Sequence, residues 1–156
     1  MSTRRAITLV ECVASIALLA AALPPTLSLL HDATDARTEA MQVERATWYA
    51  TALLESIAAD VGSASAGLGF EALDNDSTYI NDASSGLLVR TQDIGNLYGG
   101  TDLSATVDIS AKVSADGTAT GDTNLDVFRM ATVTISWPRH DGTGSLALSR
   151  LVSDYE

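Results

Sequence analysis

The sequence predicts an α+β protein, in which one long N-terminal helix is followed by a small C-terminal antiparallel sheet. Apolar residues continue almost unbroken from residue 7 to residue 30, and they then recur at helical spacing as far as residue 61. Later residues are mostly glycine, serine, threonine, asparagine and aspartate, interrupted by runs that are typical of strands. We therefore divide the chain into residues 1–6, 7–30, 31–61 and 62–156.

Length, charge and cysteine content limit the classes of function. The chain has 156 residues, enough for one ordinary domain. Its formal net charge is −11 and its one lysine is Lys112, so we predict no nucleic-acid partner. Its one cysteine, Cys12, excludes an intrachain disulfide and a zinc site built from several cysteines.

The first apolar segment is long enough to cross a membrane. Residues 7–30 would form a helix about 36 Å long, against a hydrocarbon core of about 30 Å. Arg4 and Arg5 precede it, whereas Asp32 and Asp35 follow it. The positive-inside rule then keeps the N-terminus in the cytoplasm and places the rest outside.

Glu11 is the one charge inside this segment. A carboxylate at the centre of a spanning helix costs about 2.5–3.5 kcal/mol on insertion scales, and less near an end. Two interpretations are open: the side chain extends to the lipid headgroups, or it pairs with a positive charge.

The residues around Glu11 form a specific motif. Arg4 and Arg5 lie in a short leader, Ala6 is followed by the hydrophobic Ile7 in "AITLVE", and the apolar run continues beyond Glu11. This arrangement resembles the N-terminal signature of type IV pilins and of type II secretion pseudopilins. Ala6 stands where that family usually has glycine, and Ile7 where it usually has phenylalanine.

The resemblance implies processing and assembly. Prepilin peptidase would cleave between Ala6 and Ile7, and the new amino group of Ile7 would be methylated. Glu11 would become the fifth residue of the mature chain and form an assembly salt bridge with the Ile7 amino group of a neighbouring subunit. A single chain cannot easily form this pair, because the first and fifth residues of one mature helix are poorly placed for a close contact with each other.

Other interpretations of the N-terminus are a signal peptide and a lipoprotein. Ala20 and Ala22 would suit signal peptidase, which would leave a chain that begins at Leu23. Lipid attachment at Cys12 is disfavoured, because Glu11 stands where that processing prefers a small residue.

Two prolines interrupt the apolar segment. Pro24 and Pro25 lack backbone N–H groups, so we expect a helix kink or local melting near residues 20–25. The alternative is that the pair ends the first helix.

An amphipathic helix is expected over residues 31–61. Its stripe is interpreted as the face that packs on a globular domain, rather than a coiled-coil seam or a cofactor site. Gly62 is a suitable residue just after its end. The stripe comprises Ala36, Ala40, Val43, Ala50, Leu54, Ile57 and Val61, and Trp48, Tyr49 and Leu53 widen it.

The sheet is expected after a variable region at about residues 62–100. Alternating apolar and polar side chains predict an antiparallel meander with one wet face. Pro138 is expected to end the third strand, Asp141 and Gly142 to form a turn, and residues 114–126 a longer loop. The candidate strands are residues 86–91, 103–113, 127–137 and 145–153.

No catalytic residues are predicted. His31 and His140 lack neighbouring nucleophile motifs, so both are interpreted as solvated side chains, and the chain is not expected to be an enzyme. Two acidic sets could offer oxygen ligands to calcium, but turn chemistry explains them as well, and no metal or cofactor is predicted. The sets are Asp74, Asp76, Asn81 and Asp82, and Asp116, Asp122, Asn124 and Asp126.

Together these features predict a structural, minor pilin or pseudopilin subunit. The resemblance implies a pilin-like fold, a bacterial inner-membrane location with the C-terminal domain outside the cytoplasm, and later incorporation into a filament. The implied partners are other pilin or pseudopilin subunits, prepilin peptidase, an inner-membrane assembly platform and membrane lipid. The alternative is a singly anchored extracytoplasmic binding module that does not polymerise.

Overall fold

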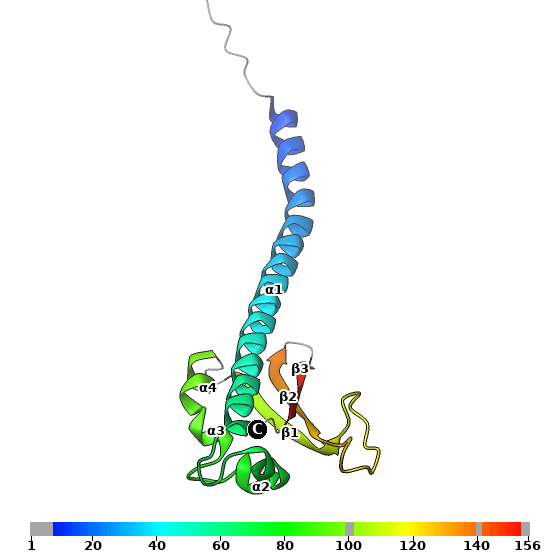
Figure 1. Cartoon of the computed structure of the whole chain (residues 1–156). Helices are drawn as coiled ribbons and strands as arrows, with labels where there is room; N and C mark the ends of the chain where they lie inside the picture. The colour runs from blue at the N-terminus through cyan, green and yellow to red at the C-terminus, as the bar shows by residue number, and fades with distance from the viewer. Residues whose placement is uncertain (1–7, 99–101, 140–141, 154–156) are drawn as a thin grey trace, which may run out of the picture. The chain divides into compact units, whose positions relative to one another are not determined.

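The computed structural model describes residues 8–98, 102–139 and 142–153, and it confirms the α+β class (Figure 1). The chain divides into two compact units, Met1–Met41 and Gln42–Glu156, and the second contains the sheet. The helices are α1 (Leu9–Val61), the 3-10 helix η1 (Phe70–Asp74), α2 (Asp76–Tyr79), α3 (Leu87–Arg90) and α4 (Gln92–Tyr98). The strands are β1 (Ser104–Val113), β2 (Phe128–Arg139) and β3 (Gly142–Ser153).

The first part of α1 is apolar, exposed and helical throughout. An 18-residue window of this helix could span a membrane by its length and composition, and none of that window is buried. Pro24 and Pro25 lie inside the helix, so the expected local melting is absent and the alternative that they end the helix is wrong. Because neither proline has an N–H, the Ala20 and Ala21 carbonyls lack their usual helical donors. A kink at the prolines stays a prediction.

The second part of α1 packs on the sheet, over a shorter face than the sequence predicts. The buried face begins at Ala46 and includes Leu53 and Ile57, which are both fully buried. Ala36, Ala40 and Val43 precede it and are exposed. Trp48 is also exposed, because it lies on the opposite side of the helix from Leu53 and Ile57.

The end of α1 differs from a standard glycine cap. Gly62 follows the helix as expected, but it does not adopt the left-handed conformation that this cap uses. Instead Gly69, whose φ is 100°, donates its N–H to the Asp60 carbonyl at 2.9 Å. The chain therefore folds back on the last turn of the helix.

The sheet is a three-stranded antiparallel meander with β2 in the centre. The odd-numbered residues of β2 from Arg129 to Trp137 are buried, whereas the even-numbered residues from Met130 to Ser136 are partly or fully exposed. The buried face packs on α1, as the alternation of the sequence predicts. The register of β1 against β2 shifts between Ile109 and Lys112, which marks an irregularity of the β-bulge type.

Pro138 does not end β2, contrary to the sequence prediction. The strand continues to Arg139, which pairs with Gly142. The neighbouring strand β1 begins at Ser104, opposite Ser136, so its pairing with β2 does not reach Pro138. The missing N–H of Pro138 therefore removes no hydrogen bond between β1 and β2. Residues 140 and 141, including His140 and Asp141, lie outside the described residues.

The prediction of a strand at residues 86–91 is wrong, because this segment forms the short helix α3. Arg90 donates its backbone N–H to the Gly86 carbonyl at 3.0 Å, and Thr91 donates to Leu87 at 2.9 Å. Leu87 is buried in the core, and α4 follows directly. A short apolar run fits a buried helical turn as well as a strand, so its periodicity cannot separate the two.

Candidate functional site

The N-terminal end of α1 carries the first candidate site, at Thr8 and Glu11. The Glu11 N–H donates to the Thr8 Oγ1 at 3.3 Å, and the Thr8 N–H points back to the Glu11 Oε2 at 3.5 Å. This reciprocal arrangement is a capping box, although its second contact is at the outer limit for a hydrogen bond. The role of Thr8 could have been predicted from the spacing of threonine and glutamate in "TLVE".

The Glu11 carboxylate retains acceptor capacity for another partner. A carboxylate has about four acceptor positions, and the long contact with Thr8 uses one of them. The side chain is exposed in the first turn of the helix, where the helix dipole favours a negative charge. The site can therefore accept an external cation. Arg4, Arg5, Ala6 and Ile7 lie outside the described residues.

The surface beyond Glu11 is apolar and exposed. From Cys12 to Leu30 the helix carries no charged side chain. His31 and Asp35 then form an exposed contact of 3.4 Å. Such a surface suits lipid or other apolar helices rather than water. Its large exposed side chains include Leu9, Val13, Ile16, Leu19, Leu23, Leu27 and Leu30.

A second cluster joins the end of α1 to α2 and α3. Arg90 donates to both carboxylate oxygens of Asp60, at 3.0 and 2.7 Å, and the Tyr79 hydroxyl donates to the Asp60 Oδ2 at 2.7 Å. Burial and the hydrogen bond to Asp60 raise the pKa of Tyr79, and the hydrogen bond to Asp60 raises the pKa of Arg90. The charged and hydroxyl groups of this cluster are therefore paired with one another.

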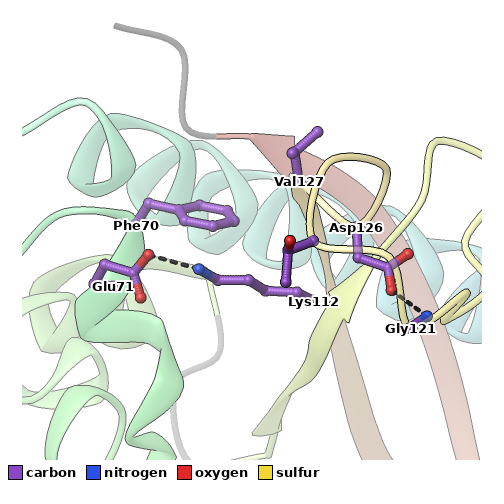
Figure 2. A pocket seen from close by; sticks show the side chains of 7 residues that line it. Phe70, Glu71, Lys112, Gly121, Asp126 and Val127 are labelled. Atoms are coloured by element: carbon purple, nitrogen blue, oxygen red, sulfur yellow. Dashed lines mark hydrogen bonds and ion pairs between the residues drawn. The ribbon is translucent and has the colours of Figure 1, made fainter.

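A hollow of about 380 Å³ lies between η1, β1 and the loop before β2 (Figure 2). Lys112 contacts Glu71 at 2.7 Å and lies 5.5 Å from the Phe70 ring centroid. On the other side, Asp126 accepts hydrogen bonds from Thr120 and Gly121. The charged groups that line the hollow are therefore already paired within the chain. Its lining is Phe70, Glu71, Lys112, Gly121, Thr123, Asp126 and Val127.

Several carboxylates of the two acidic sets are used in turns or ion pairs. Asp74 pairs with Arg129, and Asp82 accepts hydrogen bonds from Ser84 and Ser85 that lower its pKa. In the second set, hydrogen bonds from Ser114 and Thr118 lower the pKa of Asp116 to about 2. Desolvation raises the pKa of Asp126, but hydrogen bonds from Thr120 and Gly121 outweigh it and lower the pKa overall. Across the described residues, no three His, Cys, Asp or Glu side chains form a group that could hold a metal ion.

The fold and the N-terminal site define a class of protein: an α+β protein with one N-terminal helix that could cross a membrane. No family model, curated protein or solved structure matches the chain. Any more specific function has to be argued from the residues of the site.

Proposed function

We propose that the chain is a structural, minor subunit of a type IV pilus or a type II secretion pseudopilus. One observation carries the proposal: a basic leader and a small residue precede Ile7, and Glu11 lies in the first turn of an apolar helix that is exposed. A helix that only anchored a domain would need neither an acid at this position nor a cut site before it. Processing at Ala6 and Ile7 and packing of α1 against other subunits explain both.

The physical basis of assembly is the pairing of two charges in an apolar environment. Cleavage before Ile7 creates an amino group near the membrane surface, and Glu11 of a neighbouring subunit supplies the counter-charge. An unpaired carboxylate is costly in a low-dielectric environment, so the pair favours one register between packed helices. The exposed leucines and valines of α1 then pack side by side.

Intact-mass measurement of the protein purified from its membrane tests the processing step. The proposal expects a chain that begins at Ile7 and carries one added methyl group. A chain that begins at Leu23 would identify a signal peptide, and one that begins at Met1 would favour the anchored binding module. Either result would overturn the proposal.

Glu11→Gln tests the assembly step, because it separates the two roles of this side chain. Glutamine can complete a capping box, so the helix end should persist, but the charge is lost. We expect Glu11→Gln to lose cross-linking to neighbouring subunits while its level in the membrane and its cleavage stay unchanged. Normal co-assembly of Glu11→Gln in cells that lack the wild-type copy would exclude the ion pair.

Thr8→Val is the matched control for this experiment. It removes the hydroxyl that accepts the Glu11 N–H, at a cost of about 0.5–2 kcal/mol for a lost N-cap, but it keeps the carboxylate. Cross-linking should therefore largely survive. If Thr8→Val loses as much cross-linking as Glu11→Gln, the capping role rather than the ion pair is what assembly requires.

A further inference from the structure

Among the residues that the structure describes, the outer edge of β3 has no partner strand. Within the described sheet the strand order is β1-β2-β3, so β3 has a partner on one side alone. Its backbone groups on the other side are a template for an additional strand. Their identity follows from the pairing of β3 with β2.

Two observations identify these groups. Arg139 and Gly142 close the β2–β3 hairpin as a pair, so alternate pairs from there toward Val152 are hydrogen-bonded. In addition, Met130 donates its N–H to the Ser110 Oγ of β1. The backbone N–H and C=O groups of the even-numbered β2 residues therefore point toward β1 and away from β3. The N–H and C=O groups of the odd-numbered β3 residues opposite them therefore face outward. These residues are Thr143, Ser145, Ala147, Ser149 and Leu151, and all five are exposed.

The opposite edge of the sheet, on β1, is protected. The register of β1 is interrupted after Ile109, and the strand carries the charged residues Asp108 and Lys112. Lys112 is also tied to Glu71 of η1. In contrast, the twelve residues of β3 pair with β2 without a register shift and contain no proline. Natural sheets protect their edges with bulges, charges and proline, and β3 lacks these except for one charge.

The side chains of β3 indicate what would bind there. Leu146 and Leu148 face the core but stay partly exposed, so an adjacent strand would cover more of them. Arg150 follows on the same side of the strand and is exposed. Among the described cations from residue 42 onward, it is the one without a hydrogen bond or ion pair. The others, Arg45, Arg90, Lys112, Arg129 and Arg139, all have partners.

We propose that the edge of β3 binds an extended, acidic strand of a partner protein by β-augmentation. Backbone hydrogen bonds to the odd-numbered residues of β3 supply the affinity. Two apolar side chains of the partner lie beside Leu146 and Leu148, and a carboxylate two positions further along lies beside Arg150. The inference depends on the second unit of the chain and is independent of the proposed filament function.

The test uses the full chain in detergent micelles and a capped synthetic peptide, Ser-Thr-Glu-Thr-Val-Thr-Val-Thr-Ser. The expected result is binding that slows amide hydrogen exchange at Ser145, Ala147 and Ser149, whose N–H groups face outward. No binding at about 1 mM peptide, which corresponds to about −4.1 kcal/mol, would overturn the proposal. Binding without this protection would place the peptide elsewhere and would also overturn it.

Two variants examine the backbone and the charge separately. Ala147→Pro removes an outward N–H and should abolish binding, whereas the matched Ala147→Ser keeps the N–H and should bind normally, with circular dichroism showing that both are folded. Arg150→Glu should weaken binding about two- to fivefold, as expected for an exposed cross-strand charge pair. It should regain affinity for the peptide with lysine in place of glutamate. Equal binding of both peptides by both proteins would exclude the acidic specificity.

A second copy of the chain is the competing occupant of this edge. Self-pairing could place Leu148 opposite Leu148, but it would leave Arg150 opposite the apolar Leu146. The proposal therefore expects light scattering to give the same association state in micelles for the full chain and for its Ala147→Pro variant. A dimer that Ala147→Pro dissociates would assign the edge to self-association instead.

Discussion

Gly144 lies against the indole of Trp137, where there is no room for a side chain. A Cβ at this position would lie 2.5 Å from both Cε2 and Nε1 of the ring. Trp137 is itself buried in the core, so the ring cannot easily move away. The contact explains why the position opposite Trp137 in β3 is a glycine.

We predict that Gly144→Ala destabilises the protein by about 1–3 kcal/mol, the usual cost of overpacking a core. Chemical denaturation followed by tryptophan fluorescence measures the change. Gly62→Ala is the control, because the nearest atom to its added Cβ would be 4.0 Å away and its φ is not positive. Similar losses in both variants would show that the Trp137 contact is not the cause.

Tyr79 links stability to alkaline pH. Burial and the hydrogen bond to Asp60 raise its pKa above the unfolded value of about 10, so the folded chain holds this proton more tightly. The resulting stability is fully present below pH about 10 and is lost as the pH rises toward the folded pKa.

We predict that Tyr79→Phe reduces this alkaline loss and costs about 0.5–1.5 kcal/mol at neutral pH. The measurement is the denaturation midpoint of both proteins from pH 8 to pH 11, a window around the free tyrosine pKa of about 10. A partial loss should remain in the variant, because burial also raises the pKa of Tyr49. Identical pH profiles for the two proteins would contradict the assignment to Tyr79.

At the scale of the elements, the packing face of α1 is decided by which side of the helix meets the sheet. We predict that Leu53→Ala costs about 2–5 kcal/mol, because it leaves a cavity at a fully buried position. Trp48→Ala should change stability by less than about 0.5 kcal/mol, as a surface substitution does, since Trp48 is 56% exposed. Thermal unfolding by circular dichroism compares them. A larger loss for Trp48 would mean that the packing face is misplaced.

The periodic elements could be predicted from the sequence, whereas features that depend on distant partners could not. The alternation of apolar and polar residues around Val133 predicts the buried face of β2. The long apolar run predicts the N-terminal helix α1. The start of the packing face at Ala46 could not be predicted, because Ala40 and Val43 continue the same spacing but are exposed. Nothing local distinguished the short helix α3 from a strand.

The candidate sites also include local features that the sequence predicts and features that depend on residues far apart in the chain. Glu11 and the capping threonine Thr8 lie within one turn, so their relation was available from spacing alone. Asp60 and Arg90 are 30 residues apart, and their pairing exists only because η1, α2 and α3 return the chain to the end of α1. The tight packing at Gly144 likewise needed the register of β3 against β2.

At the scale of the whole molecule, the second unit contains the hydrophobic core. All residues of the core cluster follow residue 45, and the exposed apolar part of α1 precedes residue 31. A fragment that begins at His31 should therefore be a soluble monomer with an α+β circular dichroism spectrum. A fragment that begins at Ala50 is the comparison, and it should be less stable because it lacks Ala46 and Tyr49. Aggregation of the first fragment would contradict this division of α1.

The central position of β2 also determines when the domain can fold during synthesis. β1 and β3 each pair with β2 and not with each other, and residues 128–139 follow α1, the short helices and β1 in the chain. Until β2 has emerged from the ribosome, Val107 and Ile109 have no cross-strand partners, and Leu53 and Ile57 of α1 have no sheet to cover them. The nascent chain therefore exposes an incomplete core for most of its synthesis, and the last core residue, Val152 of β3, arrives after β2.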